Sequence, residues 1–179
     1  MPSSLHNRSG LQPRAPPVST LSRNADPRNI IETNRTFFVT TQTWMRKPLF
    51  QTDRNAALLI DVFRSCVRAR RFALHDFVIM PDHIHLLLTT ADDVTIEKAV
   101  QFIKGGFSFR VKRENGYTGE VWQRGFADRR VRDADSFASH RVYIADNPVK
   151  AGLALSPDEY RWCFRALARQ KGSRGTPSR

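Results

Sequence analysis

Residues 77–88, FVIMPDHIHLLL, decide how the rest of the chain folds. The residues on both sides of the Pro-Asp pair are strongly β-forming, so the stretch predicts two antiparallel strands joined by a turn. Side chains in a strand alternate between its two faces. His83 and His85 are therefore expected to point the same way, with backbones roughly 6–7 Å apart. Ile84 and the alternate leucines after it are expected to point the opposite way, into a core.

Two imidazoles on the polar face of an apolar strand are a ready pair of metal ligands. The other interpretation is that His83 and His85 are ordinary half-exposed strand residues. The pair alone does not separate the two interpretations.

Length and composition indicate one domain with a real core, because the chain has 179 residues of which 40% are hydrophobic. No apolar run reaches the length of a membrane span, and the N-terminus is polar. Cys66 and Cys163 form no metal-binding or disulfide pattern and are predicted to be buried thiols. We therefore expect a cytoplasmic protein, with its activity at the bacterial nucleoid.

The net charge of +12 is concentrated near the two ends of the chain. Residues 1–30 carry +3 and residues 160–179 carry +6, which leaves +3 for residues 31–159. Basic ends suit a polyanion, so nucleic acid is the first partner class and a membrane surface is a weak second. We expect residues 1–30 to be a disordered, Pro-rich basic arm, residues 31–165 the catalytic domain, and residues 166–179 a basic flexible tail.

The remaining periodicity predicts the order β-α-β-β-α-β followed by a further helix. The expected strands are at 35–43, 72–80, 83–90 and 120–132, and the last has a bulge at Gly125. The expected helices are one at 53–70, capped by Asp53, and one at about 95–113, capped by Thr95. A third helix is expected from about Ser136. This order is typical of a ferredoxin-like α+β sandwich, in which two helices cover one face of an antiparallel sheet. The histidines would lie on the open face, where the further helix can cover them. Gly105 and Gly106 inside the second helix predict a kink or the close approach of a DNA backbone.

A second motif lies in that further helix, at residues 143–153, YIADNPVKAGL. Tyr143 and Asn147 are four residues apart and so share one helix face, and His140 lies three residues before Tyr143 on the same side. The other interpretation is that Tyr143 is a core aromatic and that Asn147 and Pro148 form a turn that ends the helix, because proline disfavours helical geometry at the residue before it.

Together with KGGFSF at 104–109 and WQRGF at 122–126, the two motifs resemble those of the REP-associated tyrosine transposases. These proteins are HUH single-strand nucleases related to small insertion-sequence transposases, and the resemblance covers about residues 33–165. It implies a ferredoxin-like fold, one catalytic tyrosine, and a divalent ion held by two histidines and a polar residue one turn after the tyrosine. Those roles fall on Tyr143, His83, His85 and Asn147. One departure is Asp82, which stands where Asn is common.

The implied activity is metal-dependent cleavage and rejoining of single-stranded or hairpin DNA through a 5′-phosphotyrosine intermediate. The implied cofactor is Mg²⁺ or Mn²⁺, and the implied substrate is the hairpin of repetitive extragenic palindromes (REP). The proton of Tyr143 would go to the surroundings of the metal, to water or to His140. Basic residues expected to follow the DNA backbone are Arg110, Lys112, Arg113, Arg124, Arg129, Arg130 and Arg132.

Two other functions explain part of the same sequence. A non-catalytic ferredoxin-like module that binds nucleic acid would explain the charge and the fold but not the two motifs. A metal hydrolase with a water nucleophile would explain the histidines, and it would form no covalent protein–DNA adduct.

Overall fold

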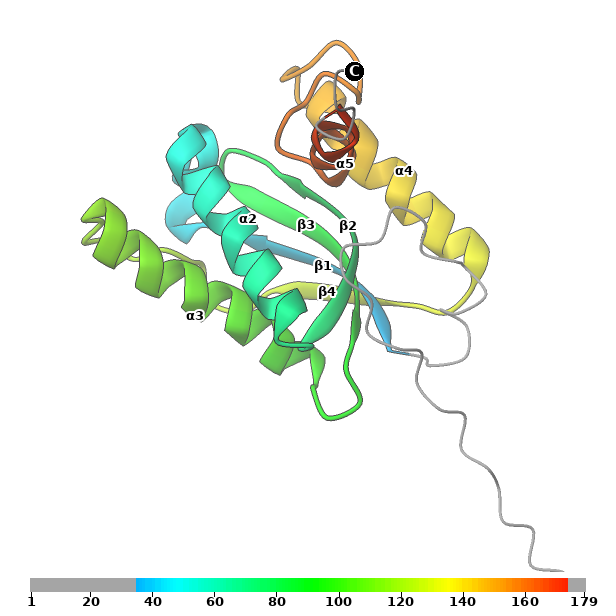
Figure 1. Ribbon diagram of the computed structural model, residues 1–179, viewed down its shortest axis with the longest axis horizontal. Helices are drawn as coiled ribbons and strands as arrows, with labels where there is room; N and C mark the ends of the chain where they lie inside the picture. Colours follow the sequence, from blue (N-terminus) through cyan, green and yellow to red (C-terminus); the bar gives the residue numbers. More distant parts are fainter. Residues whose placement is uncertain (1–34, 174–179) are drawn as a thin grey trace, which may run out of the picture.

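The structure, a computed structural model, describes residues 35–173 (Figure 1). The expected arm at residues 1–30 and the end of the expected tail lie outside the described residues. Four strands form one sheet in the order β2-β3-β1-β4, and every neighbouring pair is antiparallel. The strands are β1 Thr36–Gln42, β2 Phe72–Ile79, β3 His83–Thr90 and β4 Ala127–Val131. The predicted α+β class and the antiparallel sheet are confirmed.

Helices α2 (Asp53–Arg68) and α3 (Ile96–Asn115) cover one face of the sheet (Figure 1). Their apolar sides form the larger core with the side chains of β1, β2 and β3 that point toward them. Thr52 caps α2, because its hydroxyl accepts the N–H of Asn55. Asp53 is therefore the first residue of the helix and not its cap as predicted.

Helix α3 passes through Gly105 and Gly106 without a break. A Cβ on Gly106 would lie 3.1 Å from a Val62 side-chain carbon, while a Cβ on Gly105 would meet nothing within 4 Å. Gly106 therefore allows α3 to lie close against α2. This close contact within the protein accounts for one of the two glycines, and no kink is needed.

The opposite face of the sheet carries α4 (Ala134–Lys150), seen on the other side of the sheet from α2 and α3 in Figure 1. The Asp133 carboxylate caps it by accepting the N–H of Ser136 at 2.6 Å. Phe137 and Ile144 of α4 form a smaller buried cluster with residues of the sheet that include Leu87. Helix α4 thus closes over the face of β3 that carries the histidines.

The α4 helix does not end at Asn147 but continues through Pro148 to Lys150. Because proline has no backbone N–H, one hydrogen bond is missing in the last turns of α4. Pro148 itself is buried. The end of the helix is closed by Gly152, at φ 69°, with Leu153 N–H donating to the carbonyl of Pro148 at 2.8 Å. This closure beyond Pro148 keeps Tyr143 and Asn147 on one continuous helix.

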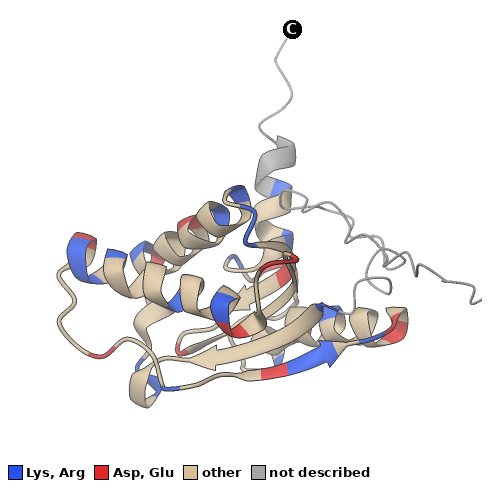
Figure 2. Cartoon of the chain, turned by 90° about the horizontal axis from the view of Figure 1, so that it is seen from below, with Lys and Arg blue, Asp and Glu red and all other residues tan. Residues whose placement is uncertain are grey.

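Strand β4 is shorter than the predicted 120–132, and its middle is basic (Figure 2). Gly125 lies at φ 70°, and Trp122 before it makes an isolated bridge with Thr43. The Trp122 indole N–H donates to the carbonyl of Lys104 at 3.0 Å and its ring is buried. Trp122 is therefore a core residue.

Residues 160–163 run along the outer edge of β2, where Ile79 N–H donates to the carbonyl of Trp162 at 2.9 Å. Helix α5 (Phe164–Ser173) follows, and the sequence analysis did not predict it. Part of the expected tail, residues 166–173, is thus helical. Cys66 and Cys163 are both buried free thiols, as expected. None of the helices within residues 35–173 has the length and apolar character needed to cross a membrane.

Candidate active site

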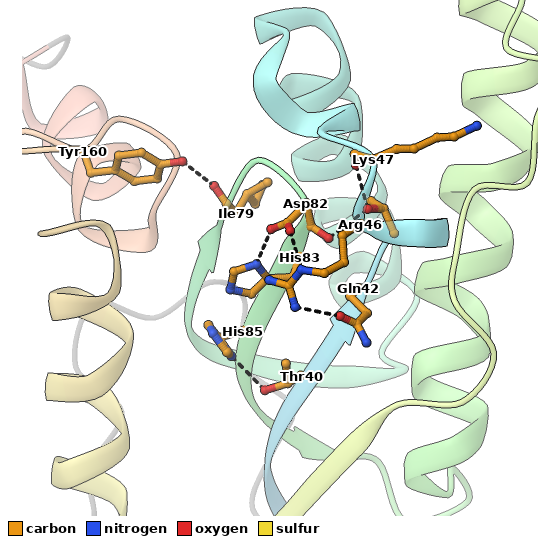
Figure 3. Close-up of polar contacts among 10 residues, drawn as sticks. Thr40, Gln42, Arg46, Lys47, Ile79, Asp82, His83, His85 and Tyr160 are labelled. Atoms are coloured by element: carbon orange, nitrogen blue, oxygen red, sulfur yellow. Dashed lines mark hydrogen bonds and ion pairs between the residues drawn. The ribbon is translucent and has the colours of Figure 1, made fainter. Parts of the chain in front are cut away.

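The imidazoles of His83 and His85 lie side by side on the α4 face of β3, with ring centroids 4.9 Å apart (Figure 3). His85 is 5% exposed, while His83, at the start of the strand, is partly exposed. The predicted shared face of the pair is confirmed by this geometry.

The ring of His83 is fixed by Asp82, the residue before it. The Nδ1 of His83 lies 2.6 Å from Oδ1 of Asp82, and a carboxylate oxygen can only accept, so Nδ1 carries a proton. Arg46 donates from Nε to the other oxygen of Asp82 at 2.9 Å (Figure 3). Burial raises the pKa of Asp82, but the hydrogen bonds and charges of His83 and Arg46 outweigh it and hold the pKa below its ordinary value. In the neutral ring the lone pair is therefore on Nε2.

The ring of His85 is fixed by Thr40, its partner across the β1–β3 pair. The Thr40 hydroxyl lies 2.8 Å from Nδ1 of His85. Burial, aided by the charge of His83, lowers the pKa of His85 to about 3. His85 is thus a neutral imidazole near neutral pH, the form in which histidine binds metals.

Tyr143 of α4 reaches the histidines from the facing helix. Its ring lies edge-on to the ring of His85, with centroids 5.3 Å apart, and it is also edge-on to Phe38 at 5.6 Å. Its side chain remains 43% exposed, so it can meet a ligand from solvent. The structure therefore brings the predicted nucleophile and the histidine pair together from two different layers.

His140, one turn before Tyr143, packs on Phe38 with ring centroids 4.6 Å apart. Its Nδ1 lies 2.6 Å from the backbone carbonyl of Ser136, which can only accept, so Nδ1 of His140 also carries a proton. The nitrogen of His140 that remains for other chemistry is Nε2.

Asn147 lies one turn after Tyr143 and is half-buried. Its side chain makes no hydrogen bond with another residue of the 35–173 segment, so its role as a ligand stays a prediction. No group of three or more His, Cys, Asp and Glu able to hold a metal is found in the described part of the chain. An imidazole nitrogen from each histidine and the amide oxygen of Asn147 are the kinds of ligand that suit a divalent ion such as Mn²⁺.

A pocket of about 510 Å³ opens beside Tyr143, between β4 and α4. Its polar lining includes Arg129, which lies directly across from Phe38 in the β1–β4 pair. The pocket is lined by Phe38, Thr40, Ala127, Asp128, Arg129, Ser139, His140 and Tyr143.

The seven basic residues predicted to follow DNA do not gather at this site. Arg110 is held by Glu114 through two hydrogen bonds, at 2.8 and 3.1 Å, on the α3 side of the sheet. Arg113 also contacts Glu114. Arg130 lies over the ring of Phe37, which belongs to the core under α2 and α3. Lys112, Arg124 and Arg132 are exposed. Of the seven, Arg129 alone lines the pocket beside Tyr143.

The chain matches the protein family described as "Transposase IS200 like" over residues 34–147, which is more than half of its length. The chain belongs to the IS200-like transposase family. The matched segment contains both histidines of β3, Tyr143 and Asn147.

Two curated relatives carry a more specific name. The REP-associated tyrosine transposase of Escherichia coli K12 is 27% identical over 103 residues, which are 57% of this chain and 58% of that protein. A Haemophilus influenzae protein named as a candidate REP-associated tyrosine transposase is 33% identical over 84 residues, which are 41% of this chain and 48% of that one. The chain thus spans about half the length of these IS200-like relatives.

A solved structure of a REP-associated tyrosine transposase, bound to a REP hairpin, shares the fold. The TM-score is 0.65 at 23% identity, and the match covers 80% of this chain and 83% of that one. The resemblance expected from the sequence is confirmed.

Proposed function

We propose that the chain is a metal-dependent endonuclease and strand transferase for single-stranded or hairpin DNA. In this proposal residues 31–165 form a ferredoxin-like catalytic domain, and α4 carries the catalytic residue Tyr143. The observation that supports it most is the contact between Tyr143 of α4 and His85 of β3, with ring centroids 5.3 Å apart. A helix and a strand from separate layers bring a tyrosine and a pair of imidazoles to one point.

A divalent cation, Mg²⁺ or Mn²⁺, would be held by His83, His85 and Asn147 and would supply positive charge against the oxygens of the scissile phosphate. Asp82 and Thr40 hold the two rings by their Nδ1 atoms, at 2.6 and 2.8 Å, and so present both Nε2 atoms.

In the reaction, the Tyr143 oxygen forms a bond to phosphorus while the bond from phosphorus to the 3′ oxygen breaks. The 3′ oxygen leaves as a hydroxyl after taking up a proton, and the 5′ phosphate stays on the tyrosine as an ester. The tyrosine proton passes to water or to Nε2 of His140, because Nδ1 of that ring is occupied by the Ser136 carbonyl. Attack of a 3′ hydroxyl from another strand end reverses the step and joins the strands.

We infer REP-type hairpin DNA as the substrate, because a relative of the same fold is described bound to a REP hairpin. Arg129 of β4, which lines the pocket beside Tyr143, is suited to the DNA backbone.

The experiment is a gel assay with an end-labelled DNA hairpin that has single-stranded flanks. We expect cleavage in Mn²⁺ or Mg²⁺, no cleavage in excess EDTA, and no cleavage by His83→Ala/His85→Ala, while DNA binding by that double variant is retained. Full cleavage by the double variant, or in EDTA, would contradict the metal role. Binding without any cleavage by the wild type would favour the non-catalytic module.

A further inference from the structure

The pocket between β4 and α4 is lined in part by Tyr143 and His140, but the steps above assign nothing to the space inside it. Its volume, about 510 Å³, falls within the range of sites that hold small organic groups. A phosphodiester that meets Tyr143 carries a nucleotide on either side, and the pocket opens beside Tyr143, where it can receive one of them.

Aromatic surface forms part of the lining of the pocket. The rings of Phe38 and His140 both line the pocket and pack on each other, 4.6 Å apart and tilted by 37°. Phe38 is also stacked on His85 at 5.5 Å, so His140 is the ring that can receive a base. Bases of single strands stack on such rings whatever their sequence, because every base has a flat π face.

A positive charge without a partner lies next to these rings. Arg129 is directly across from Phe38 in the β1–β4 register, so the two side chains share one face of the sheet. Arg129 is exposed, and its guanidinium makes no ion pair or hydrogen bond with a residue of the 35–173 segment. By contrast, Arg110 on α3 forms an ion pair with Glu114.

From this combination we propose that the pocket is a nucleotide subsite for the residue adjacent to the scissile phosphate. The base stacks on the ring of His140, beside Phe38, and Arg129 pairs with a phosphate of the same nucleotide. This inference rests on the proposed function, and it adds a binding site that the cleavage chemistry does not require.

The test is an abasic walk along the single-stranded flank of a hairpin, read as Kd in EDTA so that no cleavage is needed. Wild type should lose roughly tenfold in affinity when one particular base, beside the bond that it cuts, is removed. The His140→Ala variant should bind intact DNA more weakly than wild type does by about the same factor, and removing that base should weaken its binding no further. A role of His140 limited to accepting the tyrosine proton would leave Kd unchanged.

A second experiment, a double-mutant cycle, combines the Arg129→Gln variant with DNA in which the phosphates of that nucleotide are replaced by uncharged methylphosphonates. Each change alone should weaken binding, and the two together should weaken it no more than one. Arg68→Gln, an exposed arginine at the end of α2, is the matched control and should show additive effects at every position. The subsite is contradicted if His140→Ala and Arg129→Gln are additive with every DNA change. Failure of the proposed nuclease function is a separate result, because it would be seen as the absence of both cleavage and a covalent adduct when the divalent metal is present.

Discussion

The carboxylate of Asp82 joins two functions at the site, since one oxygen holds His83 and the other holds Arg46. Asp82→Asn keeps the shape but removes the charge, and it offers His83 a weaker acceptor. Outer partners of metal-binding histidines commonly change metal affinity 10- to 100-fold, so we expect the Kd for Mn²⁺ to rise roughly tenfold. Titration calorimetry without DNA measures it directly. Asp93→Asn, an exposed carboxylate before α3, is the control, and an unchanged Kd in Asp82→Asn would refute the role.

His75 should make folding sensitive to acid. Burial, with a smaller effect of the Arg141 charge, lowers its pKa from 6.5 to about 4. Between those pH values the unfolded chain binds the proton and the folded chain does not, so stability falls as the pH drops from about 6.5 to 4. His75→Gln, which can keep the hydrogen bond to Thr89, should remove up to about 3 kcal/mol of that fall. Urea unfolding at pH 7 and pH 4.5 measures it, and equal acid sensitivity of variant and wild type would contradict the assignment.

At this scale the sequence predicted which side chains lie together at the candidate site but not the residues that hold them. The histidine pair follows from a period of two, and Tyr143 from the helix motif. Thr40 could not be predicted, because its place opposite His85 depends on strand register. Asp82, a departure from the pattern that the resemblance implies, was expected to lie apart from the site, and this was wrong because its carboxylate holds the ring of His83.

Helix α4 is tied to the sheet by an ion pair across the layers. Arg141 of α4 donates to Asp76 of β2 at 3.2 Å, and Asp76 is 2% exposed. Burial raises the pKa of Asp76, and the hydrogen bond from Arg141 only partly offsets it. Arg141 therefore compensates a carboxylate that would otherwise be costly in the core.

Arg141→Met should lower the free energy of unfolding by about 3 kcal/mol, because it leaves the Asp76 charge buried and unpaired. The control on the same helix is Lys150→Met, which breaks an exposed pair with Asp146 and should cost at most about 0.5 kcal/mol. Urea denaturation compares the two. Equal losses in the two variants would show that the buried pair does not anchor α4.

Element boundaries were predicted where the local signals were strong and missed where distant contacts decide. The predicted strand at 83–90 is observed, and so is the cap at Thr95. The passage of α4 through Pro148 was not predicted, because the closure at Gly152 and the burial of Pro148 outweigh the lost hydrogen bond. Helix α5 was missed because its basic composition resembled that of a tail.

For the whole molecule, the order of elements decides where the site forms. The strand order β2-β3-β1-β4 puts β3 inside the sheet, with α2 and α3 on one face and α4 on the other (Figure 1). The predicted covering of the histidines by the further helix follows from this arrangement. The distribution of basic residues could not be predicted, because it depends on which arginines find a carboxylate such as Glu114.

The other tyrosines of the chain are engaged elsewhere. The hydroxyl of Tyr117 donates to the carbonyl of Glu120. The hydroxyl of Tyr160 donates to the carbonyl of Ile79 at 2.7 Å, and burial raises its pKa to about 12. Tyr143 is the tyrosine that meets the histidine pair, so Tyr160→Phe and Tyr117→Phe are matched controls for the nucleophile.

The most direct test of the account is whether Tyr143 becomes covalently joined to DNA. Wild type, Tyr143→Phe and the two control variants are incubated with a labelled hairpin and Mn²⁺, run on a denaturing gel, and mapped by mass spectrometry. We predict a denaturation-resistant adduct on Tyr143 in wild type and in both controls, and neither adduct nor cleavage in Tyr143→Phe, which still binds the hairpin. An adduct in Tyr143→Phe, an adduct on another residue, or cleavage that persists without any adduct would contradict the account.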